Sequence, residues 1–311
     1  MSKKTSYLLG ILLTIIIGTV LYWYLCCKPC LEAQNAIVET ETIEAEKPEV
    51  KTPTFNTFSA IDEKSSIRFT ASDNFNFKVS NFAILEPVSD GLKTQLERVA
   101  AYLKDNPDKA IDVTGYYTAE EKNESAFPNL GLARANAIKN YFVSIGVSTK
   151  KINTYGELND SLVPDNNSIF SGPAEYSIAT IDANDTSEQE ALVALKEDIK
   201  ANSLMLYFDT GAASINLTTQ QREKVSKIVR YIDKVDNAKI RITGHTDNTG
   251  NRETNIGLGK NRAEFAKSYL VQNGITSNKI NTFSKGPDEP IADNSTEAGK
   301  AKNRRLVVTI N

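Results

Sequence analysis

The sequence predicts an α/β protein with two tandem domains, each in the order strand, helix, strand, helix, strand, strand. Three observations predict this architecture. A long unit of sequence occurs twice, and apolar residues within each copy change between a strand period and a helix period. An apolar stretch followed by a polar stretch precedes the first copy. A chain of 311 residues has room for about two domains.

The N-terminal apolar stretch, residues 7–27, reads YLLGILLTIIIGTVLYWYLCC and has about the length of a transmembrane helix. Lys3 and Lys4 precede it, so the positive-inside rule predicts cytoplasmic residues 1–6 and periplasmic domains on an inner-membrane protein. A cleaved signal peptide is disfavoured because a small-residue cleavage site is missing. A lipoprotein signal, which would associate the protein with the outer membrane, remains the alternative.

The cysteines are Cys26 and Cys27, at the end of the predicted span, and Cys30, just after it. An intermolecular bridge, acylation and a simple interfacial position all remain open for them. With His245 as the single histidine, neither a metal site nor any other cofactor is expected. Residues 28–65 are rich in Glu, Thr, Pro and Ala, which predicts a flexible tether spanning roughly 30 Å.

The internal repeat divides the remaining chain. LGLARANAIKNYFVSIGVSTKKIN from Leu130 matches LGKNRAEFAKSYLVQNGITSNKIN from Leu258 without a gap (258 − 130 = 128). Upstream, IDVTGYYT from Ile111 matches IRITGHTD from Ile240 with one more residue of offset (240 − 111 = 129). We therefore expect a first copy at 66–181, a linker at 182–203 with an amphipathic helix from Ser187 to Lys200, and a second copy at 204–311.

The second copy contains most of the local signals. Thr218 and Gln221 form a capping box ahead of a helical apolar stripe, and Gly274 is a suitable helix C-cap. The expected elements are a strand at 204–208, a helix from Thr218, a strand from Ile240, a helix at 262–273 and a final strand at 305–310.

Two charged residues flank the polar loop of the second copy. Asp247 follows the strand, and Arg262 opens the next predicted helix (262 − 247 = 15), so the loop can bring both to one place. A carboxylate beside a guanidinium suits a zwitterion, because the guanidinium takes a carboxylate through two parallel hydrogen bonds. A helix N-terminus next to Arg262 would favour the same carboxylate. The alternative is an ordinary surface ion pair.

The second copy resembles the OmpA-like C-terminal domain, the family that includes Pal and the C-terminal part of MotB. The resemblance lies in GHTDNTG from Gly244, NIGLGKNRA from Asn255 and DNSTEAGKAKNRRLVVTI from Asp293. It implies a mixed sheet backed by helices and non-catalytic binding of the diaminopimelate in the peptidoglycan stem peptide. By the same resemblance, the ammonium binds Asp247, the carboxylate binds Arg262, Asn255 lines the pocket, and Asp209 is a less constant pocket residue.

Other residues of the motif have structural interpretations. We expect His245 to orient the loop rather than to contact ligand. The triplet Asn303 to Arg305 also recurs in the family, and we expect it to pair with the acidic loop around Asp288 and Glu289 rather than with ligand.

The first copy departs from this pattern. Thr118 stands in place of the acid and Phe127 in place of the pocket asparagine, while Arg134 matches the pocket arginine. Because Thr cannot neutralise an ammonium, we predict that the first copy does not bind diaminopimelate in the usual way. Glu120 or Glu121 in the same loop is an alternative acid. A spacer, or a surface for another envelope protein, is the expected role.

The leading hypothesis is a membrane-anchored, non-enzymatic peptidoglycan-binding protein. The alternative is a wall-anchored subunit of a larger envelope machine, such as a secretion, gliding or stator accessory. Proton conduction is not expected, because residues 7–25 contain no acidic side chain. A wall hydrolase is disfavoured by the lack of a catalytic motif, and a net charge of −3 gives no reason to expect nucleic-acid binding.

Overall fold

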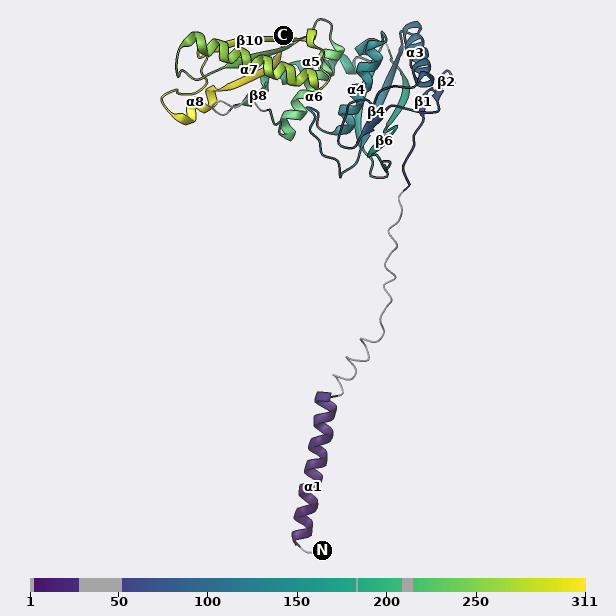
Figure 1. Ribbon diagram of the computed structural model, residues 1–311, viewed down its shortest axis with the longest axis vertical. Helices are drawn as coiled ribbons and strands as arrows, with labels where there is room; N and C mark the ends of the chain where they lie inside the picture. Colours follow the sequence, from purple (N-terminus) through teal and green to yellow (C-terminus); the bar gives the residue numbers. More distant parts are fainter. Residues whose placement is uncertain (1–2, 28–51, 183, 209–214) are drawn as a thin grey trace. The chain divides into compact units, whose positions relative to one another are not determined.

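The computed structural model describes residues 3–27, 52–182, 184–208 and 215–311, which belong to two units, Met1–Lys51 and Thr52–Asn311 (Figure 1). In the N-terminal unit, helix α1 (Lys3–Tyr22) continues into the π-helical turn η1 (Trp23–Cys27). Within the described ranges, no helix is both long enough and apolar enough to cross a membrane. The predicted transmembrane span at residues 7–27 is therefore not supported.

The first repeat of the Thr52–Asn311 unit contains a mixed five-stranded sheet in the order β2-β1-β7-β4-β5. Strand β4 is parallel to β5 and antiparallel to β7. A separate ribbon pairs β3 with β6. The elements in chain order are β1 (Phe58–Asp62), β2 (Ile67–Ala71), β3 (Asn76–Lys78), α3 (Asp90–Asp105), β4 (Lys109–Tyr117), α4 (Leu130–Ser144), η2 (Thr149–Lys151), β5 (Ile152–Leu158), β6 (Ile169–Ser171) and β7 (Ala174–Thr180).

Strand β1 corrects the predicted tether, residues 28–65. Phe58 and Ala60 are completely buried, and β1 pairs with β7 at Ala60 and Tyr176. The Phe58 ring packs 4.7 Å from that of Tyr176, measured between centroids. The polar composition of the segment concealed a short alternation of apolar and polar residues, which is a strand signal. Residues 28–51 of the predicted tether lie outside the described part.

The second repeat forms a mixed four-stranded sheet in the order β10-β9-β11-β8, with β9 parallel to β10 and antiparallel to β11. A short helix, α8, separates the last two strands and was missing from the predicted order. The elements are β8 (Leu204–Tyr207), α6 (Thr219–Lys234), β9 (Ile240–His245), α7 (Arg252–Gln272), η3 (Ser277–Lys279), β10 (Ile280–Gly286), α8 (Glu297–Asn303) and β11 (Arg305–Ile310).

Matching glycine pairs bring a helix against a strand in both repeats. A Cβ on Gly244 of β9 would lie 2.0 Å from the carbonyl oxygen of Gly259 on α7. A Cβ on Gly115 of β4 would lie 2.1 Å from the carbonyl oxygen of Gly131 on α4. Because only glycine permits this approach, the helix backbone packs directly on the strand in each repeat. The repeats differ at their first strand, since β1 is parallel to β7 whereas β8 is antiparallel to β11.

Helix α7 is longer than the predicted helix at 262–273, because it begins at Arg252. The Asn251 side chain caps it by accepting hydrogen bonds from the backbone N–H groups of residues 253 and 254. Gly257 and Gly259 lie in the segment predicted as a loop, and Gly259 serves the close packing on β9. Arg262 thus lies inside the helix, and the expected help from a helix N-terminus beside it was wrong.

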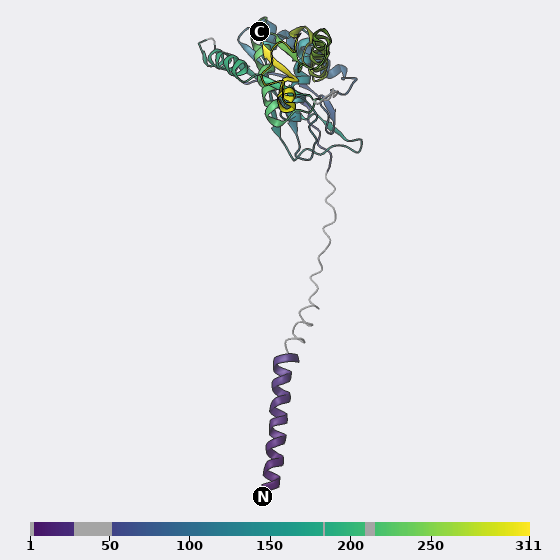
Figure 2. The same cartoon turned by 90° about the vertical axis from the view of Figure 1, so that its left-hand side faces the viewer.

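The linker helix predicted at Ser187 to Lys200 is confirmed as α5 (Ser187–Ala201), which packs on α6. The two repeats also contact each other directly, and the green and teal elements lie together in Figure 2. Phe127 of the first repeat is 1% exposed and belongs to the apolar core of the second repeat. Lys139 Nζ lies 2.5 Å from Asp233 Oδ2, which joins α4 to α6. Residues from Thr52 onward accordingly form one unit.

Candidate ligand-binding site

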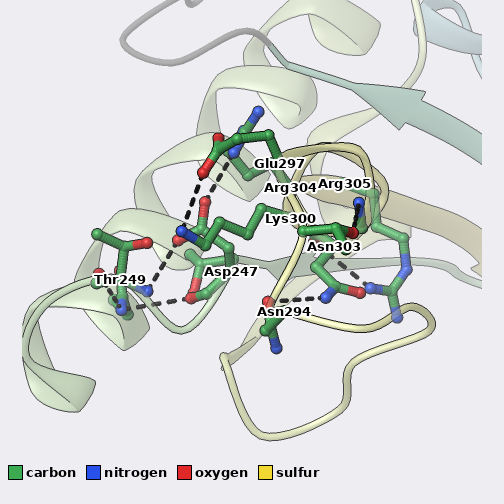
Figure 3. Close-up of polar contacts among 12 residues, drawn as sticks. Asp247, Thr249, Asn294, Glu297, Lys300, Asn303, Arg304 and Arg305 are labelled. Carbon is green, nitrogen blue, oxygen red and sulfur yellow. Dashed lines mark hydrogen bonds and ion pairs between the residues drawn. The ribbon is translucent and has the colours of Figure 1, made fainter.

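Asp247 lies two residues beyond the end of β9, with both carboxylate oxygens engaged (Figure 3). Arg304 Nη1 donates to Oδ2 over 2.8 Å, and the Thr249 backbone N–H donates to Oδ1 over 2.9 Å. Burial raises the pKa of Asp247, but the hydrogen bonds from Arg304 and Thr249 outweigh it and hold the pKa below its ordinary value. The carboxylate is therefore ionised at neutral pH.

Arg262 is the second predicted binding residue, and it is 7% exposed within α7. Its Nη1 atom has no hydrogen-bond partner among the described residues. Its Cζ atom lies 5.4 Å from the ring centroid of Phe208. Burial and the charge of Arg304 lower the pKa of Arg262, while the charge of Asp247 raises it. A buried guanidinium with an unsatisfied N–H is a strong donor for an incoming carboxylate.

The structure does not join Asp247 and Arg262 as an ion pair. Asp247 interacts electrostatically with Arg262, but its hydrogen-bonded cation is Arg304. The site therefore contains two guanidinium groups and one carboxylate. In such a cluster, a guanidinium can bind the carboxylate of a ligand while the acid binds its ammonium.

Asn255 and Asp209 were predicted to line the pocket. Asn255 lies in the first turn of α7 and is buried, and its Nδ2 donates to the backbone carbonyl of Thr249 over 3.0 Å. This bond fixes the loop that contains Asp247, so Asn255 acts on the shape of the site. Asp209 lies outside the described residues.

His245 is buried at the end of β9. Burial and the neighbouring positive charge of Arg305 lower the pKa of His245 to about 4. The imidazole is consequently neutral at pH 7. Its Nδ1 atom lacks a hydrogen-bond partner in the part of the chain that the structure describes.

The triplet from Asn303 divides into two roles. Asn303 Oδ1 accepts hydrogen bonds from the backbone N–H groups of Ile291 and Ala292 at 2.8 and 3.1 Å. Arg305 Nη2 donates to the Glu289 carbonyl over 3.0 Å. These two residues support the acidic loop as expected. Figure 3 shows that Asn303 is also bonded to Asn294.

Arg304 was predicted to pair with the acidic loop, and that prediction was wrong, because the side chain bonds Asp247 instead. Asp288 of that loop pairs with Arg252. Arg304 is the C-cap residue of α8, whereas Arg305 is the first residue of β11, and the two neighbouring side chains bond different partners. The sequence pattern does not indicate which of these two arginines reaches Asp247.

The first repeat contains a different arrangement at the matching position. Arg134 is completely buried, and its guanidinium bonds the carboxylate of Glu121. Of the two acids considered as replacements, Glu121 is therefore the one that lies at the arginine. It is bonded to this cation, and its two oxygens are already engaged by Arg134 and by backbone N–H groups.

A protein-family model described as the OmpA family matches residues 79–170 and 207–304. The chain belongs to the OmpA family. The two matched segments lie within the two predicted copies, one in each. The second OmpA-family segment contains Asp247, Arg262 and Arg304.

Curated OmpA-family relatives match part of the chain. Outer membrane protein Omp38 of Acinetobacter baumannii is 38% identical over 117 residues, 37% of this chain and 32% of that protein. Peptidoglycan-binding protein ArfA of Mycobacterium tuberculosis is 35% identical over 101 residues, 32% of this chain and 31% of that protein. A peptidoglycan-associated lipoprotein of Brucella melitensis is 31% identical over 106 residues, 34% of this chain and 62% of that protein. The matches to Omp38 and ArfA span about a third of those proteins' lengths.

Solved structures also match. The peptidoglycan-associated lipoprotein from Burkholderia pseudomallei has a TM-score of 0.31 and 29% identity, covering 34% of this chain and 89% of that chain. The C-terminal domain of Helicobacter pylori MotB has a TM-score of 0.30 and 25% identity, covering 35% of this chain and 84% of that chain.

Proposed function

We propose that this OmpA-family protein is a non-catalytic peptidoglycan-binding anchor of the cell envelope, and that its second repeat binds the diaminopimelate of the stem peptide. The observation that supports this most is the buried Arg262, whose Nη1 has no hydrogen-bond partner in the described ranges, close to the ionised Asp247. The names of two relatives, a peptidoglycan-binding protein and a peptidoglycan-associated lipoprotein, agree with it.

The free end of a diaminopimelate side chain has an ammonium and a carboxylate on one carbon. In the proposed complex, Arg262 takes the carboxylate, as a guanidinium can donate two parallel hydrogen bonds. Asp247 takes the ammonium. Each of its oxygens accepts one described hydrogen bond, and a carboxylate has about four acceptor positions, so there is room for the ligand's N–H groups. Arg304 holds the Asp247 carboxylate in place.

Affinity at one such site is expected to be modest. A hydrogen bond to a charged group contributes roughly 1.5–3 kcal/mol, and association offsets a large part of the sum. Peptidoglycan presents many copies of the stem peptide, so rebinding along the polymer makes retention firmer than a single contact would. A weak site is therefore sufficient for an anchor.

Co-sedimentation of the full chain with purified diaminopimelate-containing sacculi tests the proposal. The double variant Asp247→Ala and Arg262→Ala should remain in the supernatant. Arg252→Met is the matched control, because Arg252 lies on the same helix but forms an exposed ion pair with Asp288. Equal retention of the double variant and the unmodified chain would refute the proposal.

A further inference from the structure

The arginine at the pocket position has a complete set of partners in the first repeat. Arg134 Nη1 donates to Glu121 Oε2 over 3.0 Å, and Nη2 donates to Glu121 Oε1 in a short bond. Arg134 Nη1 also donates to the Tyr116 carbonyl over 2.8 Å. The two side chains are 0% and 1% exposed, so this fork lies entirely inside the repeat.

The Glu121 carboxylate is surrounded by donors. Besides the guanidinium, the Ser80 backbone N–H donates to Oε1 over 2.8 Å, and the Thr118 backbone N–H donates to Oε2 over 3.0 Å. Each oxygen thus accepts one bond from Arg134 and one from the backbone. Two rigid backbone donors and a bidentate guanidinium form a site built for a carboxylate.

Both repeats contain a buried arginine beside a phenylalanine ring, but only the arginine of the first repeat has a described carboxylate bonded to it. The Cζ atom of Arg134 lies 5.3 Å from the ring centroid of Phe170, and that of Arg262 lies 5.4 Å from the ring centroid of Phe208. Yet Arg262 Nη1 has no hydrogen-bond partner within the described ranges. Among the described residues, the difference is a carboxylate bonded to the arginine, which Glu121 supplies in the first repeat.

We propose that the first repeat retains a binding site for a small carboxylate and that Glu121 fills it permanently as a built-in ligand. Glu121 as a residue is partly exposed, whereas its side chain is 1% exposed, so its backbone borders solvent and its carboxylate lies inside at Arg134. We expect truncation of this side chain to open a passage from solvent to the guanidinium. External carboxylates are excluded while Glu121 is in place. The inference does not depend on peptidoglycan binding by the second repeat.

The test measures thermal unfolding of the full chain in sodium acetate and in sodium chloride of equal ionic strength at pH 7. Glu121→Ala leaves a buried guanidinium without its partner and should lower the melting temperature by about 10 °C in chloride. Acetate should restore several degrees of this loss, because it binds the folded state at Arg134. The unmodified chain sets the baseline, since any effect of acetate at Arg262 is common to both proteins.

Two control variants locate the effect. Glu121→Gln keeps the space filled, so acetate should not restore its stability. Glu121→Ala combined with Arg134→Met removes the guanidinium and should also show no acetate effect beyond the baseline. The same acetate shift in Glu121→Ala and in the unmodified chain would overturn the inference. Should Glu121→Ala not fold in chloride, refolding yield replaces the melting temperature, and equal yields in the two salts would likewise overturn it.

Discussion

Arg304 Nη1 donates a hydrogen bond to Asp247 Oδ2 over 2.8 Å, and the two side chains are only 15% and 13% exposed. Arg304 therefore belongs to the candidate site, where it fixes the carboxylate that we assign to the ligand's ammonium. It also competes with that ammonium for the same group. We expect Arg304 to position the Asp247 carboxylate more than it blocks the ammonium, because the carboxylate has acceptor positions beyond its two described bonds.

Arg304→Met should weaken retention on sacculi about tenfold, because a hydrogen bond to a charged group contributes roughly 1.5–3 kcal/mol. Co-sedimentation over a range of sacculus concentrations measures the change. Lys302→Met removes an exposed cation two residues away and serves as control. Stronger retention of Arg304→Met would show that the arginine blocks the ammonium instead.

Asp247 should stabilise the fold at neutral pH and lose this effect in acid. Its folded-state pKa is held below the ordinary value of 3.8 by the bonds from Arg304 and Thr249, which outweigh burial. Stability from a depressed carboxyl pKa is present above the unfolded pKa and is lost as pH falls through the folded pKa. Urea unfolding of the unmodified chain and Asp247→Asn should therefore differ at pH 7 and converge below pH 3.8.

His245 should make the second repeat sensitive to mild acid. Burial and the charge of Arg305 lower the pKa of His245 from 6.5 to about 4, so the unfolded chain binds this proton more readily than the folded one. Stability must then decrease as pH falls from 6.5 toward 4, by up to about 2 kcal/mol. Urea unfolding at successive pH values should show a smaller decrease in His245→Gln. A parallel decrease in both proteins would mean that other groups are responsible.

Phe127→Ala should destabilise the Thr52–Asn311 unit by about 3–5 kcal/mol, because the ring fills part of the second repeat's core. Chemical denaturation measures the loss. Phe55→Ala is the control, since Phe55 is 61% exposed and its removal should change stability little. Equal effects of the two substitutions would contradict the proposed coupling of the repeats.

Two glycines of helix α7 should respond in opposite ways to alanine. A Cβ on Gly259 would meet Ser284 Oγ at 2.4 Å and the Gly244 carbonyl at 3.0 Å, so Gly259→Ala should destabilise by about 1–3 kcal/mol. A Cβ on Gly257 meets nothing within 4 Å, so Gly257→Ala should stabilise by about 0.5–1 kcal/mol. The melting temperatures of the two variants measure these effects. A similar change in both would show that close packing at Gly259 is not the deciding factor.

Local signals and internal comparison predicted much of the fold. The capping box at Thr218 and Gln221 is present in the structure, and the linker helix at Ser187 has nearly its expected length. The start of α7 could not be placed, because glycines that serve tertiary packing resemble loop glycines in sequence. The burial of Phe58 depends on Tyr176, more than a hundred residues away, and polar composition concealed it.

The sequence was sufficient to name residues of the candidate site, but not to predict which of them bond each other. Asp247 and Arg262 were identified by a motif, but a motif does not say which cation bonds the carboxylate. That choice depends on the junction between α8 and β11, where Arg304 caps the helix and Arg305 begins the strand. Glu121 was likewise one of two neighbouring acids until the fold placed its side chain on Arg134.

The contacts between the repeats have a mechanical consequence. The N-terminal segment joins the Thr52–Asn311 unit through the first repeat, whereas the candidate site lies in the second. Tension between that segment and a wall-bound second repeat would not stretch α5 alone. Part of the load would pass through the Lys139–Asp233 pair and the 2.7 Å bond from Asn140 to the Gly274 carbonyl. The first repeat would thus transmit force to the second repeat through their shared contacts. Substitutions that weaken these contacts should lower the force at which the two repeats separate, without changing affinity for the ligand.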